Sequence, residues 1–342
     1  MVKNSIYEQF KELNNKRISD TQQGYNVLPI EGTQHKLGVS SEGYPMFFIK
    51  TKRSQTAPRN ILLNILKVEY SVPCKFRDDS DQEIDDLYTI ITLQSEDDSL
   101  YYDFIDIVIL MLHRLEDEPS TRNIAIEVEN LSSIFSAMNC PPLKKIQGLW
   151  AELLVIEQSK KPDVLINAWH TQTNAKYDFT LGRDKIEVKS TRSEVRKHHF
   201  SLDQLNPTPH SQLLIASVVV RESGHGNGGK TLRDLYNLLS DKVNSNNAKL
   251  RLYQIIITSL GNDYKHFDDE CFDYIGAKDS LKYFDYHLIP GIDKSNVDQG
   301  VSSVGFDSDL SGVIDINSPE SNFDVSSSPL YLNSATNCVI RY

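Results

Sequence analysis

The chain has 342 residues, of which 39% are hydrophobic and 24% are charged, so it is long enough to fold into two or three domains. Its formal net charge of −11 excludes a surface covered with nucleic-acid-binding cations, because phosphate affinity comes mainly from clustered lysine and arginine. No stretch approaches the ~20 apolar residues that cross a bilayer, and the polar N-terminus lacks the apolar core of a secretion signal. We therefore expect a cytoplasmic protein without membrane contacts.

Positive charge is concentrated in one stretch of the chain. Thr171 to His210 holds seven Lys or Arg residues against five Asp or Glu, together with three histidines. Acidic residues dominate elsewhere, for example between Asp78 and Asp86. One local region therefore has the composition to face a polyanion, although the chain as a whole does not.

Residues 1–139 have the pattern of an α+β region. An amphipathic helix is predicted over Ser5–Asn15, and two further helices are predicted near the end of the region. The expected strands are Pro45–Lys50, Leu62–Tyr70 and Leu87–Leu93, and the later helices are Ser99–Glu116 and Asn123–Met138. Cys140-Pro141-Pro142 then interrupts the helical pattern and marks the predicted boundary.

Residues 140–250 are predicted to form a central α/β core. Leu143–Lys160 has a helical apolar stripe with Glu152 at its border, and Pro162 prevents this helix from continuing. Two strands, Lys176–Leu181 and Lys185–Ser190, follow around a polar turn. The remaining predicted elements are a short helix opening at Ser201, a strand buried on both faces over Leu213–Arg221, and an amphipathic helix over Thr231–Val243.

Residues 251–342 are predicted to be β-rich and irregular. Short strands are expected at Leu252–Thr258 and Tyr283–Ile289. Residues 293–328 are rich in Ser, Asp, Asn and Gly, which favours an exposed segment or an interaction surface. The predicted fold is therefore α+β overall, with an α/β core flanked by an N-terminal α+β region and a C-terminal β-rich region.

The candidate catalytic residues lie in the central hairpin. An even number of loop residues pairs Leu181 with Ile186 and Asp178 with Lys189. Because side chains alternate along a strand, the apolar residues of both strands cover one face. The opposite face then gathers Asp178, Thr180, Glu187 and Lys189.

Two carboxylates and an ammonium group on one face are costly if they are buried without partners. Mg²⁺ would relieve much of this cost, since it prefers oxygen ligands and commonly uses one or two carboxylates with waters and a substrate phosphate. Asp178 and Glu187 suit that role, and the Val188 carbonyl and the Glu152 carboxylate are further candidate ligands. Lys189 would position an attacking water or stabilise charge on a scissile phosphate. The alternative is an exposed hairpin whose charged side chains are simply solvated.

The order of these elements resembles the PD-(D/E)XK superfamily of restriction-endonuclease-like nucleases. The segments GLWAELL, YDF, IEVKST and HHFSLDQL lie within a block of about 60 residues and are similar to a family of bacterial defence loci that was first catalogued as a domain of unknown function. The resemblance implies an αβββαβ core and Mg²⁺-dependent cleavage of DNA in restriction or antiphage defence. It places Glu152, Asp178, Glu187 and Lys189 on the acidic and lysine positions of the family. Tyr177 stands where the name of the motif has proline.

Five further residues are candidates for auxiliary or DNA-binding roles. His199 and Gln204 match the family block after the lysine, and they would contact phosphate or orient the lysine or the water. The equally weighted alternative makes His199 an ordinary strand residue and Gln204 a helix-capping residue. Arg192, Arg196 and Lys197 are candidates for phosphate steering, with a solvated polar loop as the alternative.

A competing motif lies further along the chain. Gly224 to Thr231 (GHGNGGKT) matches the phosphate-binding pattern G-x4-G-K-[ST], with a strand-like run before it and a helix after it. No convincing later strand ends in the acidic residue that such ATPases use to hold magnesium. A flexible connection between strand and helix is therefore the favoured interpretation.

Three hypotheses follow from the sequence. The first is a DNA endonuclease that uses Mg²⁺, with Mn²⁺ as a substitute, and the resemblance implies methyltransferase or ATPase subunits of a defence system as partners. The second is a non-catalytic assembly or adaptor subunit that retains the nuclease fold, which the acidic charge and the polar C-terminal region favour. The third is nucleotide binding at residues 224–231. A homo-oligomer is compatible with each of them.

Overall fold

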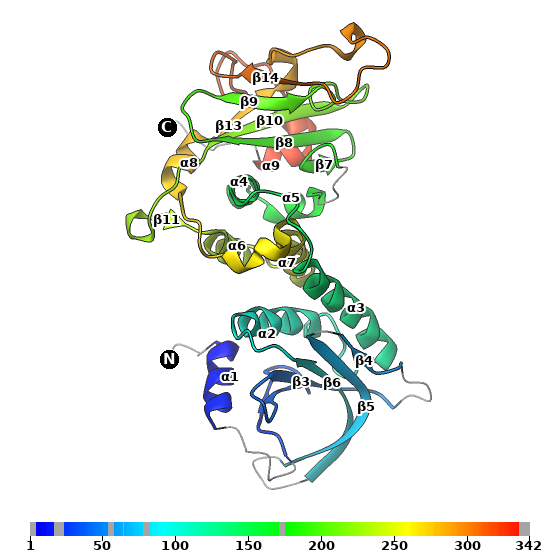
Figure 1. Cartoon of the computed structure of the whole chain (residues 1–342). Helices are drawn as coiled ribbons and strands as arrows, with labels where there is room; N and C mark the ends of the chain where they lie inside the picture. The colour runs from blue at the N-terminus through cyan, green and yellow to red at the C-terminus, as the bar shows by residue number, and fades with distance from the viewer. Residues whose placement is uncertain are drawn as a thin grey trace. The chain divides into compact units, whose positions relative to one another are not determined.

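The computed structural model describes residues 5–16, 24–53, 58–63, 65–77, 83–170 and 175–334. The chain divides into two compact units, Met1–Ser136 and Ala137–Tyr342 (Figure 1). Both units contain helices and strands, so the predicted α+β class is confirmed. None of the helices in the described ranges is both long and apolar enough to cross a membrane.

The first unit is built on one antiparallel sheet. Its strand order is β1-β2-β3-β6-β5-β4, and α2 lies across the sheet in Figure 1. The Phe104 ring of α2 packs against Phe47 of β3, with ring centroids 5.6 Å apart. The elements are α1 (Ile6–Asn15), β1 (Val27–Pro29), β2 (Lys36–Val39), β3 (Pro45–Lys50), β4 (Ile61–Leu62), β5 (Leu66–Arg77), β6 (Glu83–Leu93), α2 (Ser99–Leu112) and α3 (Thr121–Ala137). The predicted strand over Leu62–Tyr70 is wrong in one respect, because the chain reverses between β4 and β5.

The second unit contains a mixed four-stranded sheet of order β13-β10-β8-β7. The central strands β8 and β10 are parallel, and the outer two are antiparallel to their neighbours. Almost every residue of β10 is buried, as predicted for a strand covered on both faces. The four strands are β7 (Phe179–Leu181), β8 (Asp184–Thr191), β10 (Gln212–Val219) and β13 (Lys282–Asp285).

Helices cover one face of this sheet and a two-stranded ribbon covers the other. Helix α4 is buried on all sides and lies between the sheet and α6 with α7 (Figure 1). The ribbon pairs β9 with β14. The remaining elements of the unit are α4 (Ile146–Glu157), α5 (Pro162–Ala168), β9 (Lys197–Ser201), β11 (Gly229–Lys230), α6 (Leu232–Lys242), α7 (Asn246–Leu260), β12 (Phe272–Asp273), α8 (Tyr274–Ser280), β14 (Gly305–Asp309) and α9 (Pro329–Ser334).

The hairpin of β7 and β8 has a register two residues away from the predicted one. Phe179 pairs with Ile186 and Leu181 pairs with Asp184, so the turn consists of Gly182 and Arg183 alone. Gly182 has a φ of 60°, which glycine adopts at little cost and which permits so tight a turn. A shift of two residues keeps every side chain on its predicted face, since side chains alternate with period two.

Two predicted elements of the second unit are wrong. Leu252–Thr258 lies inside helix α7 rather than in a strand, because Ser245 caps the helix and the buried residues recur at helical spacing despite the β-branched run. Residues after Ser201 form a series of turns rather than a short helix. The boundary predicted at residue 250 also falls within α7.

The C-terminal region belongs to the second unit. Strand β14 pairs with β9 through Gly305 to Asp309. Leu310, which follows β14, is fully buried in a cluster with Phe200, Leu213 and Ile215. The irregular segment predicted over residues 293–328 is therefore anchored to the core at β14, although most of it lies outside helices and strands.

Strand β9 has one buried and one exposed side. His198 and Phe200 are buried, whereas Lys197, His199 and Ser201 are exposed. The His198 Nε2 atom lies 2.8 Å from the Ser217 hydroxyl of β10. Burial lowers the pKa of His198 to about 4, so this imidazole is neutral at neutral pH.

We predict that His198 makes the second unit acid-sensitive. The unfolded chain binds a proton at His198 near pH 6.5, but the folded chain does so only near pH 4. The stability contributed by neutral His198 is therefore complete above pH 6.5 and falls as the pH drops toward 4, by up to about 1.4 kcal/mol per pH unit.

Urea unfolding at pH 7.5 and pH 5, followed by tryptophan fluorescence, measures this effect. Both tryptophans of the chain, Trp150 and Trp169, lie in the second unit. His198→Gln should reduce the loss of unfolding free energy between the two pH values, whereas His199→Gln, one residue away on the exposed side, should leave it unchanged. An equal loss in the parent and both variants would contradict the prediction.

Candidate active site

The first part of the site is a buried carboxylate on α4. Glu152 lies in the middle of this helix with 4% of its surface exposed. Its Oε2 atom accepts a hydrogen bond of 2.6 Å from the indole N–H of Trp169, which follows α5. The Nζ atom of Lys144 lies 2.6 Å from both carboxylate oxygens. Both oxygens of Glu152 are therefore already bonded within the protein.

Lys144 also joins Glu152 to Asp178. Its Nζ atom donates to Oδ1 of Asp178 at 2.8 Å. The sequence analysis placed Lys144 inside the predicted helix over Leu143–Lys160 without assigning it a role, whereas α4 begins at Ile146 and Lys144 precedes it. The available signal was the charge balance, since three neighbouring acids need more than the single cation of Lys189.

Asp178 connects this cluster to the sheet. It directly precedes β7, and its Oδ2 atom accepts a hydrogen bond of 2.9 Å from the backbone N–H of Val188 in β8. Strand β7 pairs with β8 only as far as Ile186. The aspartate therefore occupies a backbone donor of β8 beyond the end of β7.

Glu187, Lys189 and Gln204 form the second part of the site. The Nζ atom of Lys189 lies 3.0 Å from Glu187 Oε1 and 3.0 Å from Gln204 Oε1. The amide nitrogen of Gln204 donates to Glu187 Oε1, and the backbone N–H of Ser201 donates to Gln204 Oε1 at 3.1 Å. Gln204 thus holds both the carboxylate and the ammonium group, from the turns that replace the predicted short helix.

The electrostatics of the site are dominated by buried negative charge. Burial, followed by the charge of Asp178, raises the pKa of Glu152 and of Glu187, each to about 8. Lys144 and Lys189 oppose this increase through ion pairs and hydrogen bonds. The raised pKa means that these two carboxyl groups keep their protons more readily than usual, and a further cation in this partly desolvated cluster would favour their ionised form.

The predicted Mg²⁺ ligands differ in how their oxygen atoms are already bonded within the protein. No group of three or more His, Cys, Asp or Glu side chains in the described ranges has the arrangement of a metal site. Asp178 and Glu187 still offer the two carboxylates that Mg²⁺ commonly takes from a protein. The oxygens of Glu152 bond to Lys144 and Trp169, and those of Asp178 bond to Lys144 and Val188, so an ion would replace a protein partner at either carboxylate. The Val188 carbonyl stays a predicted ligand, and the N–H of the same residue donates to Asp178.

Arg196 does not have the predicted phosphate-steering position. Its guanidinium is buried, and it donates to the carbonyl and the hydroxyl of Ser217 at 2.8 and 2.9 Å. It also donates to the carbonyl of Ser280. The side chain faces the sheet because β9 turns its alternate residues inward, so Arg196 links β9 to β10 and α8.

The other predicted cations are exposed and engaged in ion pairs. His199 lies 3.0 Å and Lys197 3.3 Å from carboxylate oxygens of Asp307 on β14. His199 therefore occupies the strand position of the alternative interpretation, away from Lys189. Arg192 pairs with Glu222 at 2.8 Å. The positive charge predicted for phosphate steering is thus largely balanced by nearby acids.

The segment that matches the phosphate-binding pattern lacks the geometry such a loop requires. Lys230 lies in β11, paired with Phe272, and its Nζ atom is 5.3 Å from the centre of the Tyr274 ring. The Thr231 hydroxyl accepts the N–H of Asp234 as the cap of α6. Neither side chain is placed to hold a phosphate and its metal, so the structure argues against nucleotide binding here.

We predict that Lys144 is required for the stability of the second unit. Lys144→Met leaves two largely buried carboxylates without their shared cation, which should reduce the free energy of unfolding by roughly 3 kcal/mol at neutral pH. The matched control is Lys145→Met, since Lys145 is the adjacent, exposed lysine. Urea unfolding followed by tryptophan fluorescence compares them, and equal stability of the two variants would refute the role of Lys144.

The comparisons with known proteins address the family of the chain. Residues 6–311 match the family model described as "Putative PD-(D/E)XK family member, (DUF4420)". No curated protein matches the chain. No solved structure matches it either. Because the family model spans most of both units, the resemblance seen in the sequence is confirmed, and the chain belongs to the DUF4420 family of PD-(D/E)XK-like proteins.

Proposed function

We propose that the protein is a Mg²⁺-dependent endonuclease that hydrolyses phosphodiester bonds of DNA. The observation that carries this proposal is the convergence of Asp178, Glu187, Lys189 and Gln204 beside the part of β8 that β7 leaves uncovered. Membership of a PD-(D/E)XK-like family supports a nuclease. The alternative of a solvated hairpin is less favoured, because Glu187 is buried and Lys189 has two specific partners.

Each residue of the site has a separate role in the proposed reaction. Asp178 and Glu187 would hold the metal ion, which supplies Lewis-acid activation of the phosphate and of a water when bound. Lys189 presents an ammonium group next to these carboxylates, where it would orient the attacking water and stabilise negative charge on the phosphate. Gln204 also accepts a hydrogen bond from Lys189 and so restricts the directions in which its N–H groups point.

Glu152 has a supporting role in this proposal. It fixes Lys144 next to Asp178, and Trp169 fixes the carboxylate in turn. The aspartate is then held from two directions, by Lys144 on one oxygen and by Val188 on the other. Such double restraint positions a metal ligand before the metal arrives.

We predict that cleavage depends on Lys189 and Asp178. Purified protein with Mg²⁺ or Mn²⁺ should cut DNA, and Asp178→Ala or Lys189→Ala should reduce the rate by about 100-fold or more, since each removes charge next to the reacting phosphate. Lys282→Ala is the matched control, because this exposed lysine lies on β13 of the same sheet. The assay compares plasmid, linear, modified and single-stranded DNA, and equal rates for Lys189→Ala and the parent would exclude the assigned role.

We also predict that Mn²⁺ stabilises the protein through Asp178. At a concentration about 100 times its dissociation constant, a bound ion adds about 2.7 kcal/mol to the free energy of unfolding. Thermal unfolding should therefore shift upward with Mn²⁺ in the parent and in Lys282→Ala, but not in Asp178→Ala. A shift that persists in Asp178→Ala would place the ion elsewhere.

A non-catalytic adaptor subunit is the second candidate function. Lys144 already neutralises Asp178 in part, so the acidic cluster is stabilised without any metal. An adaptor would show neither cleavage nor a Mn²⁺-dependent shift. A place in restriction or antiphage defence, with methyltransferase or ATPase subunits as partners, rests on the family resemblance for both candidates.

A further inference from the structure

A pocket of about 360 Å³ is lined in part by Tyr177, which directly precedes Asp178 of the candidate active site. It is lined by residues from the segment before β7, from the β7–β8 hairpin and from the turns before β10. The residues that matter for its chemistry are His170, Lys176, Tyr177, Thr180, Lys185 and Thr208. We call it the Lys176–Lys185 pocket.

The two lysines of this pocket bond only to neutral oxygens. Lys176 Nζ donates to the carbonyl of Asn206 at 2.8 Å. Lys185 Nζ donates to the Arg183 carbonyl at 3.1 Å and the Ser211 hydroxyl at 3.0 Å. Neither lysine forms an ion pair with any carboxylate in the described ranges, in contrast to Arg192 and Lys197. Asp203 lies near Lys176 and Asp184 near Lys185, but the positive charge of the pocket is not held in direct ion pairs with either of them.

Tyr177 holds the two ammonium groups near one another. Lys176 Nζ lies 5.2 Å and Lys185 Nζ 5.9 Å from the centre of its buried ring. Both contacts are within the range of a cation–π interaction. The two charges repel each other, so an anion that reaches both ammonium groups would be stabilised by both.

The pocket is directly connected to the proposed active site. The backbone N–H of His170 donates to the carbonyl of Asp178 at 2.9 Å. Lys185 precedes Glu187 by two residues on β8, so both side chains point to the same face of the sheet, about 6.6 Å apart along the strand. A DNA strand advances about 3.4 Å along the helix axis per phosphate. The pocket is therefore close enough for one DNA strand to reach both it and the carboxylate and ammonium groups of Glu187 and Lys189.

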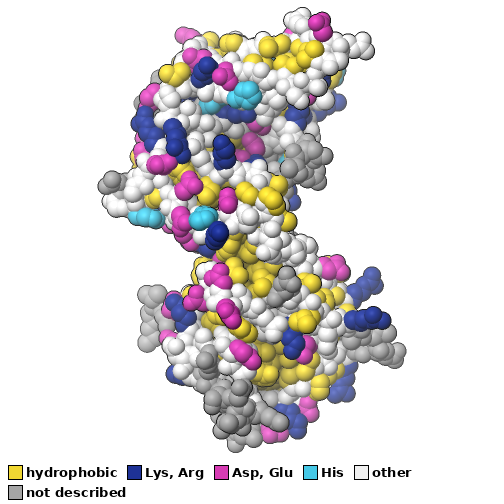
Figure 2. Space-filling view, viewed as in Figure 1, with side chains coloured by type: hydrophobic (Ala, Val, Ile, Leu, Met, Phe, Trp, Pro, Cys, Tyr) yellow, Lys and Arg dark blue, Asp and Glu magenta, His cyan; other side chains and the backbone are white. Residues whose placement is uncertain are grey.

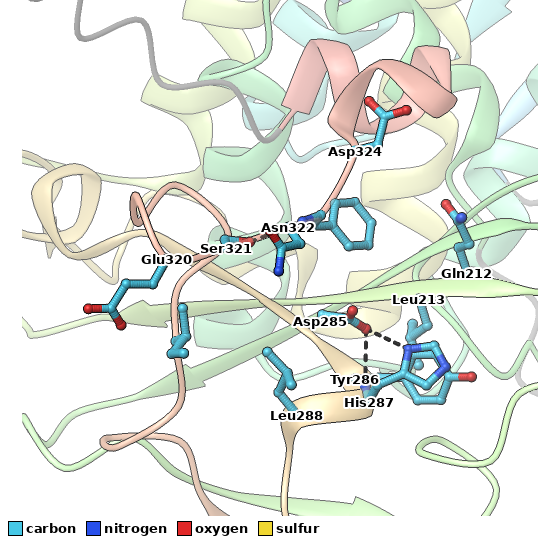
Figure 3. Close-up of a pocket in the computed structure, with 12 residues that line it drawn as sticks. Gln212, Leu213, Asp285, Tyr286, His287, Leu288, Glu320, Ser321, Asn322 and Asp324 are labelled. Carbon is cyan, nitrogen blue, oxygen red and sulfur yellow. Dashed lines mark hydrogen bonds and ion pairs between the residues drawn. The ribbon is translucent and has the colours of Figure 1, made fainter.

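A second cavity in the same unit has the opposite character. It has a volume of about 510 Å³ and is lined by Asp285, Glu320 and Asp324, among others (Figure 3). Its His287 side chain already bonds to Asp285 at 2.9 Å. On the face of the molecule in Figure 2, basic and acidic side chains are interspersed over this unit. The Lys176–Lys185 pocket thus differs from this second cavity in the sign of the charged side chains that line it.

We propose that the Lys176–Lys185 pocket binds a phosphate of the DNA backbone close to the phosphate at which the strand is cut. This inference rests on the proposed nuclease function and adds a DNA-anchoring site to it. The need for an anchor is electrostatic, because the three carboxyl groups of Glu152, Asp178 and Glu187 outnumber the two ammonium groups bonded to them at the place where a polyanion must bind. Two unpaired ammonium groups and the hydroxyls of Thr180 and Thr208 offset that imbalance with donors suited to phosphate oxygens.

Fluorescence anisotropy with a labelled DNA duplex tests the proposal on the full-length chain. EDTA in the buffer prevents metal-dependent cleavage, so binding is measured separately from catalysis. The double variant Lys176→Gln/Lys185→Gln should bind about tenfold more weakly, and the slope of log K against log salt should fall by about 0.9 for each phosphate that the variant no longer neutralises. Lys176→Arg/Lys185→Arg keeps the charge and should retain binding.

The paired surface cations provide the matched control. Arg192→Gln/Lys197→Gln removes the same formal charge from the same unit and should bind DNA nearly as well as the parent. The proposal is overturned if the Lys176/Lys185 glutamine variant binds like the parent, or if the parent does not bind DNA. Displacement of the duplex by about 10 mM inorganic phosphate at constant ionic strength would indicate a free-phosphate site and would also overturn it.

A second measurement needs no substitution and is independent of folding defects in a variant. Acylation of lysines in the native protein, with and without the duplex, should show protection of Lys176 and Lys185 but not of Lys197. Protection of Lys197 alone would refute the proposal. DNA that protects the pocket but is not cut when Mg²⁺ is added would contradict the nuclease assignment while supporting the anchoring site, so the two failures are distinguishable.

Discussion

The burial of Glu152 beside Asp178 imposes a requirement that much of the second unit serves. A carboxylate in the middle of a helix that is covered on all sides must find compensating donors, or the helix cannot pack there. Lys144 and Trp169 provide them, and each comes from a segment at the end of a different helix. The chain before α4 and the chain after α5 are thereby held in place next to β7. Packing and chemistry are not separable at this point of the fold.

The same requirement explains how the two halves of the site are coupled. Asp178 receives Lys144 on one oxygen and the Val188 N–H on the other. Val188 lies between Glu187 and Lys189 in β8. Its bond to Asp178 therefore fixes the aspartate relative to the strand that carries Glu187 and Lys189. Gln204 completes the connection by bonding to both Glu187 and Lys189. A displacement of either half is therefore resisted by hydrogen bonds that belong to the other.

Periodicity predicted the parts of the fold that local patterns determine. The helix with Glu152, the buried strand β10 and the facial sorting of the hairpin all follow from apolar spacing, and the sorting was unaffected by the register error because the error was even. The strand expected at Leu252–Thr258 failed because three consecutive isoleucines suit a strand locally, whereas tertiary packing selected a helix. The position of β14 next to β9 could not be predicted, since nothing local encodes a pairing across about a hundred residues.

The site was predictable as far as residue types and alternation allowed. Asp178, Glu187, Lys189 and Gln204 lie together, whereas the cations chosen by proximity in sequence do not join them. Arg196 is buried in the sheet and Lys197 pairs with Asp307, because alternation along β9 and a distant strand decided where these side chains point. The contact between Lys144 and Asp178 was not predicted, because the two residues are 34 positions apart in the chain. Contacts of this range depend on topology rather than on spacing.

The pairing of β9 with β14 has a consequence for the biosynthesis of the protein. His199 lies opposite Asp307, so the chain must be more than 300 residues long before this ribbon can form. Translation delivers the chain from its N-terminus, and β14 therefore leaves the ribosome long after α4, β7 and β8. A nascent chain that lacks β14 exposes the outer edge of β9 and leaves the cluster around Phe200 without Leu310. Assembly of this ribbon must therefore wait until β14 has left the ribosome.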